Sequence, residues 1–247
     1  VSDNVKPTIS CPANVTANTN SGCTATGVAL GTPVTSDNCG VASVTNNAPV
    51  AFPIGATTVT WKVTDNSGNF ATCDQTVTVS DNVKPTISCP ANVTANTNSG
   101  CTATGVALGT PVTADNCGIA SVTNNAPVAF NIGVTTVTWK VTDNSGNFVT
   151  CDQTVTVSDN VKPTITCPAN VTANTNSGCT ATGVALGTPV TSDNCGVASV
   201  TNNAPVAFPI GVTTVTWKVT DNSGNFATCD QTVTVSDNVK PTITCPA

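Results

Sequence analysis

The sequence predicts an all-β protein made of tandem β-sandwich repeats that are cross-linked by disulfides and arranged end to end as a rod. Three observations predict this fold class. A unit of 78 residues recurs along the chain, apolar and polar residues alternate with a period of two inside the unit, and each unit carries four cysteines. A long period reduces the fold problem to that of one unit.

The repeats are nearly identical to one another. The first and third copies differ only at Ser10/Thr166 and Ala56/Val212. The predicted domains are 3–80, 81–158 and 159–236, with the start of a truncated fourth copy at 237–247. Because both ends fall inside the pattern, we expect a piece of a longer protein. Repetition also indicates function, because reach and avidity grow with copy number whereas an active site is rarely needed three times.

One unit contains about seven short strand segments. In 57–64 the residues Val59, Trp61 and Val63 alternate with polar residues, and 70–79 alternates in the same way, so both are predicted strands. Gly68 supplies the positive φ that the hairpin between them needs. Shorter predicted strands are 8–11, 15–18, 24–30 and 41–46, with further turns at 37–40 and 53–55. Such spacing is typical of an Ig-like sandwich, and strand order stays open.

Composition excludes several function classes. The chain has a net charge of −6 with only 8% charged residues, and it contains neither Arg nor His. It therefore lacks the basic surface that nucleic acids and anionic membranes require, and no apolar run is long enough for membrane insertion. Units of about 80 residues have marginal cores. Four cysteines per unit are the usual remedy in oxidising compartments, so we expect an extracellular protein.

Four segments of the unit together resemble a known repeat family. They are Asp3-Asn4-Val5-Lys6-Pro7-Thr8-Ile9-Ser10-Cys11-Pro12, Asp37-Asn38-Cys39-Gly40, the stretch from Ile54-Gly55 to Val59-Thr60-Trp61, and Asp65-Asn66-Ser67-Gly68-Asn69-Phe70-Ala71-Thr72-Cys73. The combination is similar to the hyalin repeat (HYR) module over the whole chain. The resemblance implies Ig-like sandwiches in extracellular matrix, adhesion or bacterial surface proteins, and no enzymatic activity. Near-identity of neighbouring copies suits the long arrays of gliding-type bacterial adhesins.

The cysteines allow three pairings within each unit, and spacing does not choose among them. The family resemblance and the shared sequence contexts favour Cys11–Cys73 with Cys23–Cys39, worth about 4 and about 3 kcal/mol by loop entropy. The later copies would follow with Cys89–Cys151, Cys101–Cys117, Cys167–Cys229 and Cys179–Cys195, leaving Cys245 unpaired. The alternative crosses the junctions as Cys73–Cys89, Cys151–Cys167 and Cys229–Cys245. Zinc is not expected, because His and Cys-x-x-Cys are absent.

Candidate site residues are few. No catalytic site is expected, because His and Glu are absent and the cysteines are predicted to be bridged. Oxygen-rich residues that would suit calcium are Asp37, Asp65, Asn69, Asp81 and Asn82. The competing interpretation is that these side chains only stabilise turns, and Lys84 beside the junction favours it. Asn14, Asn92 and Asn170 fit the N-glycosylation pattern.

The predicted function is structural. We expect stalk or spacer repeats of a very long secreted cell-surface adhesin or filament, which project a binding region away from the cell. Neighbouring repeats of the same chain are then the main partners. Two alternatives remain: a multivalent array in which each copy binds glycan or matrix, and a fibre that self-associates through exposed strand edges.

Overall fold

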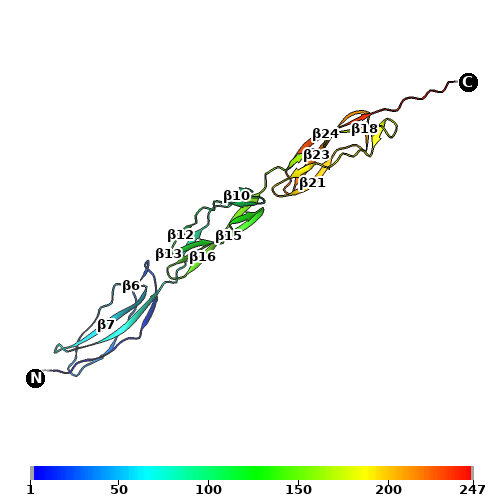
Figure 1. The fold of residues 1–247 in the computed structure, drawn as a ribbon. Coiled ribbons are helices and arrows are strands. Elements are labelled where there is room, and N and C mark those ends of the chain that lie inside the picture. Colours follow the sequence, from blue (N-terminus) through cyan, green and yellow to red (C-terminus); the bar gives the residue numbers. More distant parts are fainter. Residues whose placement is uncertain (1–2, 246–247) are drawn as a thin grey trace. The chain divides into compact units, whose positions relative to one another are not determined.

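The structure is a computed structural model that describes residues 3–245. These residues contain strands, turns and loops and no helix (Figure 1), and hence no helix that could cross a membrane. Contacts divide them into two compact units. The first comprises Val1–Ala91, Gly109–Ala126 and Val137–Gln153, and the second Asn92–Leu108, Pro127–Thr136 and Thr154–Ala247.

The first copy lies wholly in the first unit and forms two layers. Its main sheet has the order β2-β8-β7-β5, in which β2 runs parallel to β8 and the other neighbours are antiparallel. The second layer consists of two antiparallel pairs, β1 with β4 and β3 with β6. The bounds are β1 (Thr8–Ser10), β2 (Val15–Asn18), β3 (Thr24–Thr26), β4 (Val34–Ser36), β5 (Val41–Asn46), β6 (Ala51–Pro53), β7 (Gly55–Asp65) and β8 (Phe70–Ser80).

The second and third copies repeat these strands. In the second copy they are β9 (Thr86–Ser88), β10 (Val93–Asn96), β11 (Thr102–Thr104), β12 (Val112–Ala114), β13 (Ile119–Asn124), β14 (Ala129–Asn131), β15 (Gly133–Asp143) and β16 (Phe148–Ser158). In the third they are β17 (Thr164–Thr166), β18 (Val171–Asn174), β19 (Thr180–Thr182), β20 (Val190–Ser192), β21 (Val197–Asn202), β22 (Ala207–Pro209), β23 (Gly211–Asp221) and β24 (Phe226–Ser236). The third copy, in the second unit, has the main sheet β18-β24-β23-β21.

The core follows from the predicted alternation. Val59, Trp61 and Val63 of β7 are buried, as are Val77 and Val79 of β8. Val59, Trp61, Val77 and Val79 pack on Ala25 and Phe52 of the second layer, together with half-buried residues that include Ile9 and Leu30. Burial of these side chains supplies the main stabilisation of so small a unit. The predicted strands and hairpin of the two long segments are confirmed, and Gly68 has a φ of 90°.

Two short strands were not predicted, and one predicted strand is too long. The segment 24–30 ends as a strand at Thr26, because Gly27 has a φ of 65°, which breaks the ladder. The strands β4 and β6 have only three residues each, too few for an alternating pattern to be detected. Their positions depend on pairing with β1 and β3, which is a tertiary property.

A buried glutamine joins the two layers and was also not predicted. Gln75 of β8 is fully buried, and its Oε1 accepts a hydrogen bond from Trp61 Nε1 at 3.0 Å. Its Nε2 donates to the carbonyl oxygens of Ala13 at 2.7 Å and Leu30 at 2.9 Å. Gln75 thereby pairs the buried Trp61 N–H and two partly buried carbonyl groups.

Candidate metal centre and cysteine pairs

Three aspartates meet at the start of every copy. The sets are Asp3, Asp37 and Asp65; Asp81, Asp115 and Asp143; and Asp159, Asp193 and Asp221, and within each set the carboxylate oxygens lie within 4.8 Å of one another. Each set combines the first residue of the copy, the loop before the fifth strand and the end of the seventh strand. The sheet register brings the last two together, because Val41 pairs with Asp65.

The aspartate at the end of the seventh strand is held by its own turn. In the second copy Asp143 Oδ1 accepts hydrogen bonds from the backbone N–H groups of Ser145 at 2.9 Å and Asn147 at 2.8 Å. The Asn147 side chain donates to Asp143 Oδ2 at 2.8 Å and to the Asp81 carbonyl oxygen at 3.2 Å. Asn147 therefore ties the turn to the first residue of the copy.

The pKa of the equivalent Asp65 in the first copy shows the balance of forces. Burial alone raises this pKa, but hydrogen bonds from the Asn69 side chain and from the backbone of Ser67, Gly68 and Asn69 outweigh it and lower the pKa below its ordinary value. The carboxylate is thus held in its charged form, which is the form that binds a cation.

The first aspartate of the second copy has one satisfied and one free oxygen. Asp81 Oδ1 accepts hydrogen bonds from Val83 N at 3.1 Å, Thr19 Oγ1 at 3.0 Å and Asn116 Nδ2 at 3.3 Å. Burial raises the pKa of Asp81, yet these donors lower it overall. The side chain is 8% exposed, and its Oδ2 is buried without a hydrogen-bond partner.

The middle aspartate shows the same asymmetry. Asp115 Oδ2 accepts a hydrogen bond from Cys117 N at 2.7 Å, whereas its Oδ1 is buried without a partner. Asp37 Oδ1 and Asp193 Oδ1 are likewise unpartnered. Within residues 3–245 no lysine forms an ion pair with these carboxylates. Three converging charges with free buried oxygens fit a hard divalent cation, and carboxylate oxygens are preferred calcium ligands.

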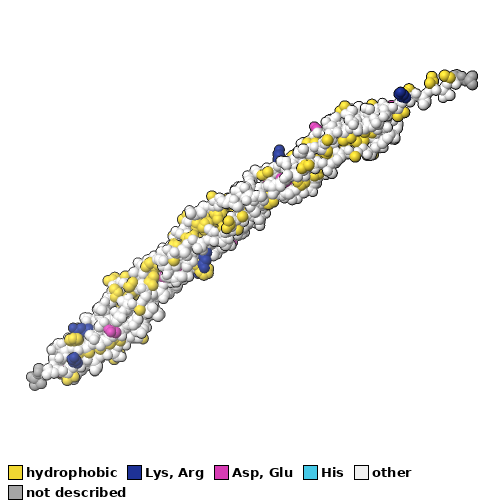
Figure 2. Space-filling view, viewed as in Figure 1, with side chains coloured by type: hydrophobic (Ala, Val, Ile, Leu, Met, Phe, Trp, Pro, Cys, Tyr) yellow, Lys and Arg dark blue, Asp and Glu magenta, His cyan; other side chains and the backbone are white. Residues whose placement is uncertain are grey.

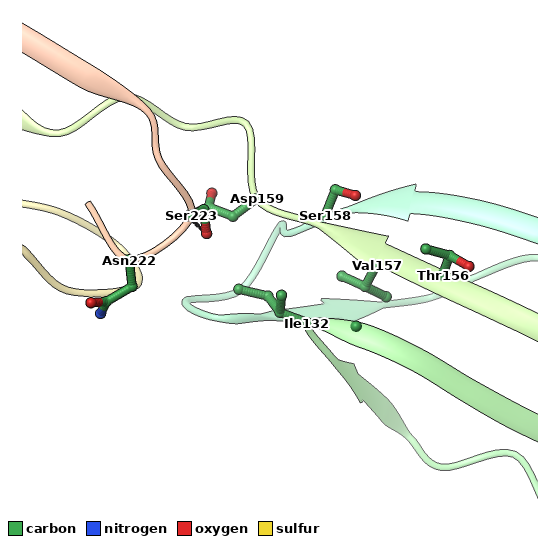
Figure 3. A pocket seen from close by; sticks show the side chains of 8 residues that line it. Ile132, Thr156, Val157, Ser158, Asp159, Asn222 and Ser223 are labelled. Carbon is green, nitrogen blue, oxygen red and sulfur yellow. Dashed lines mark hydrogen bonds between the residues drawn. The ribbon is translucent and has the colours of Figure 1, made fainter. Parts of the chain in front are cut away.

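A shallow cavity lies beside the acidic centre in both units. In the second unit it measures about 370 Å³ and is lined by Ile132, Thr156–Asp159 and Ser223, among others. Figure 3 shows Asp159 next to Ser223, whose hydroxyl donates to Asp159 Oδ2 at 3.3 Å. The first unit has an equivalent cavity of about 360 Å³ beside Asp81. The aspartate centre therefore lies next to space that solvent can reach.

One asparagine per junction connects a copy to the preceding one. Asn116 Nδ2 donates to Thr19 Oγ1 at 3.4 Å, to the Gly22 carbonyl oxygen at 3.2 Å and to Asp81 Oδ1. In the second unit Asn194 makes the same three contacts, with Thr97, Gly100 and Asp159. The junction thus uses specific side-chain contacts in both units.

The expected calcium residues are only partly brought together. Asp37 and Asp65 meet, with Asn69 donating to Asp65, and the third member is Asp3, which was not among the candidates. Asp81 instead joins Asp115 and Asp143 of its own copy. Asn82 is exposed and its side chain makes no hydrogen bond within residues 3–245, so it lies outside the centre. The recurrence of Asp at the first position of each copy was the signal that could have identified Asp3.

Within residues 3–245, each of the three complete copies contains one disulfide. Cys11 is bonded to Cys73, with 5.7 Å between their Cα atoms, and the later copies have Cys89–Cys151 and Cys167–Cys229. This is the first of the two bridges that the family resemblance implies. It also precludes the alternative junction pairing, because Cys73, Cys151 and Cys229 are already bonded within their copies.

The second expected bridge, Cys23–Cys39, is not formed, and neither are Cys101–Cys117 and Cys179–Cys195. Thr19 N bonds to the Ser80 carbonyl oxygen and so places the Cys23 turn at one end of the sheet, whereas the Asn66 side chain holds the Cys39 carbonyl at the other end. The 11-residue strand β7 separates these ends by about 30 Å. A disulfide needs Cα atoms within about 7 Å of each other.

Four of these cysteines instead approach partners in a neighbouring copy: Cys23, Cys101, Cys117 and Cys195. Cys23 Sγ lies 3.4 Å from the Asn116 carbonyl oxygen, and Cys117 Sγ lies 3.6 Å from the Gly22 carbonyl oxygen. The pKa of Cys117 is raised to about 12 by burial, by a hydrogen bond with the Cys23 thiol and by the nearby Asp81 charge. Cys245 is exposed and unbonded.

The three asparagines of the glycosylation pattern are exposed and have a structural role. Asn14 Oδ1 accepts a hydrogen bond from Thr76 N at 2.9 Å, and Asn92 and Asn170 do the same with Thr154 and Thr232. Each asparagine therefore extends the pairing between the second and eighth strands. Glycosylation of their amide nitrogens stays a prediction.

The fold and its sites define a class of protein: tandem all-β, disulfide-bonded sandwich repeats. The HYR domain family model matches residues 2–79, 80–157 and 158–235. The chain therefore belongs to the HYR domain family.

Hyalin of Strongylocentrotus purpuratus is 34% identical over 253 residues, which cover 96% of this chain and 21% of that protein. The chain thus spans about a fifth of the length of this relative. Among solved structures, Drosophila N-cadherin EC1-4 has a TM-score of 0.36 at 11% identity, covering 93% of this chain and 75% of that one. The protocadherin GammaB4 extracellular domain has a TM-score of 0.36 at 14% identity, covering 93% and 43%.

Proposed function

We propose that these HYR copies are structural repeats of a longer secreted, cell-surface adhesion protein, in which they act as a stalk that holds a binding region away from the cell. The observation that carries the proposal is the repeated junction: Asn116 and Asn194 each make the same two contacts with the preceding copy. A junction with fixed contacts keeps successive copies extended, so that each copy adds to the total length, better than a flexible linker does.

The surface supports a spacer role over an enzymatic one. Figure 2 shows sparse, scattered charges on the visible face, in keeping with 8% charged residues overall. The lysines of the seventh strands lie over phenylalanine rings, such as Lys62 at 4.4 Å from the Phe70 centroid. Sparse charge repeated in every copy fits repeats that supply length. A bacterial gliding-type adhesin is the parent protein we favour, because neighbouring copies are so nearly identical.

Small-angle X-ray scattering tests the stalk. We expect the largest dimension to grow by about 35–45 Å per copy when the chain is compared with a version extended by three further copies. A constant largest dimension would contradict the proposal. Binding to glycan or matrix that rises steeply with copy number would instead support the multivalent array, and lateral assembly visible by electron microscopy would support the self-associating fibre.

We propose further that each acidic centre binds calcium and thereby stiffens the junction beside it. Asp81 Oδ2 and Asp115 Oδ1 are the buried oxygens left free for the ion, with Asp143 as the third carboxylate. Asp81 also accepts hydrogen bonds from Thr19 of the preceding copy and from Asn116. A cation that fixes Asp81 therefore also fixes the contact between copies.

Thermal unfolding with and without calcium checks this assignment. At 100-fold excess over Kd, calcium should stabilise the chain by about 2.7 kcal/mol per site, which raises Tm by about 10 °C or more relative to EDTA. Asp115→Asn together with Asp193→Asn should abolish most of this increase. Asp74→Asn is the matched control, because Asp74 is exposed and bonds to Thr60 away from the centre. An equal Tm in calcium and EDTA would refute the calcium site.

A further inference from the structure

We propose that neighbouring copies are covalently joined by disulfides between the Cys23 position of one copy and the Cys39 position of the next, that is, Cys23–Cys117 and Cys101–Cys195. These bridges would differ from every pairing that the sequence suggested. None of the four thiols belongs to the acidic sets.

The geometry of the first pair carries the proposal. Each thiol lies against the backbone next to the other cysteine. Cys23 Sγ contacts the carbonyl oxygen of Asn116, the residue before Cys117, and Cys117 Sγ contacts the carbonyl oxygen of Gly22, the residue before Cys23. The Cys23 thiol is also among the groups that raise the pKa of Cys117. Asn116 holds the arrangement by donating to the Gly22 carbonyl oxygen at 3.2 Å and to Cys117 Sγ at 3.1 Å.

The second unit contains the same arrangement. Cys101 Sγ lies 3.4 Å from the Asn194 carbonyl oxygen, and Cys195 Sγ lies 3.7 Å from the Gly100 carbonyl oxygen. Cys117 and Cys195 are half-buried, whereas Cys39, which has no preceding copy in this sequence, is exposed. Burial of this cysteine therefore coincides with the presence of its cross-copy partner.

The chemistry needs an oxidant that carries a disulfide, such as an oxidised dithiol catalyst or oxidised glutathione. The exposed Cys23 attacks one sulfur of that disulfide as a thiolate, forming a mixed disulfide and releasing one thiol of the oxidant. Cys117 then attacks the Cys23 sulfur and releases the second thiol. Two protons pass from the cysteines to the two departing thiols, so that the two cysteines are oxidised and the oxidant is reduced to two thiols.

Peptide mapping of the oxidised full chain distinguishes the pairings. Cleavage before each Asp puts Cys11 and Cys23 together in peptide 3–36. Cys39, Cys73 and Cys117 fall in three separate peptides, which are 37–64, 65–73 and 115–142, respectively. After oxidation by oxidised glutathione and alkylation of free thiols, we expect 3–36 to be linked to both 65–73 and 115–142. Peptide 37–64 should be recovered alkylated and unlinked, and 81–114 should be linked to 193–220.

Two variants provide the control. Cys117→Ser should abolish the link between 3–36 and 115–142 and leave Cys23 alkylated, whereas the same substitution at the equivalent position of the first copy, Cys39→Ser, should leave that link unchanged. Recovery of 3–36 linked to 37–64, or alkylation of both Cys23 and Cys117 in the oxidised chain, would overturn the proposal. The calcium and scattering experiments give separate readouts, so failure here leaves the stalk function intact.

Discussion

Replacing Gln75, Gln153 and Gln231 by leucine is expected to lower the free energy of unfolding by about 3–6 kcal/mol per copy. In the first copy, leucine fills similar space but leaves the Trp61 N–H and the carbonyl oxygens of Ala13 and Leu30 without their partner. Each buried polar group that loses its hydrogen bond costs about 1–3 kcal/mol. A domain of this size has only about 4–12 kcal/mol in total, so the copies should be largely unfolded on mild heating.

Guanidinium unfolding followed by tryptophan fluorescence measures this effect, because each copy has one tryptophan. The matched control is Thr78→Leu, which introduces the same residue on the exposed face of the same strand and should change stability by less than about 0.5 kcal/mol. Equal losses in the glutamine and threonine variants would show that the buried hydrogen bonds contribute nothing specific.

Removal of the disulfide within each copy should lower the free energy of unfolding by a similar amount. The variant replaces Cys11 and Cys73, and the equivalent cysteines of the other two copies, by alanine. It opens a loop whose ends are 62 residues apart in sequence. The loop-entropy relation estimates the resulting loss of stability at about 4 kcal/mol per copy. The bridge ties the segment after β1 to β8 across the core, where Cys11 and Cys73 pack beside the buried cluster. The expected result is a midpoint shift to much lower denaturant.

The control for this prediction is Cys39→Ala in the first copy. Cys39 is exposed and unbonded, so its replacement should leave the midpoint nearly unchanged. A shift below about 1 kcal/mol on removal of the three bridges would mean that the denatured chain is already restricted without them.

The two long strands illustrate what local pattern can predict. Val59, Trp61 and Val63 alternate with polar neighbours over an entire strand, so the buried face of β7 was visible in the sequence. The three-residue strands β4 and β6 carry no such pattern, and only their partners define them. Gln75 falls on the apolar face of β8, where periodicity favours an apolar residue, and its hydrogen bonds to distant carbonyls explain the exception.

The candidate sites divide in the same way. Asp37, Asp65 and Asn69 were visible because each lies in a turn sequence, whereas Asp3 joins them only through folding. The predicted Cys23–Cys39 bridge is not formed in the structure. Sequence spacing does not indicate which end of a sheet a loop occupies. Cys23 and Cys39 are 16 residues apart in the chain, yet they lie at opposite ends of the sandwich, which are separated by the length of β7.

The sequence by itself determined the repeat unit, the all-β class and the residues of the main hairpin. These depend on period and composition, which are local and are repeated in every copy. Only the tertiary structure decided which aspartates converge, which oxygens stay free and which thiols meet. Those outcomes depend on strand register and on the contact between successive copies, since both bring together residues that no spacing along the chain connects.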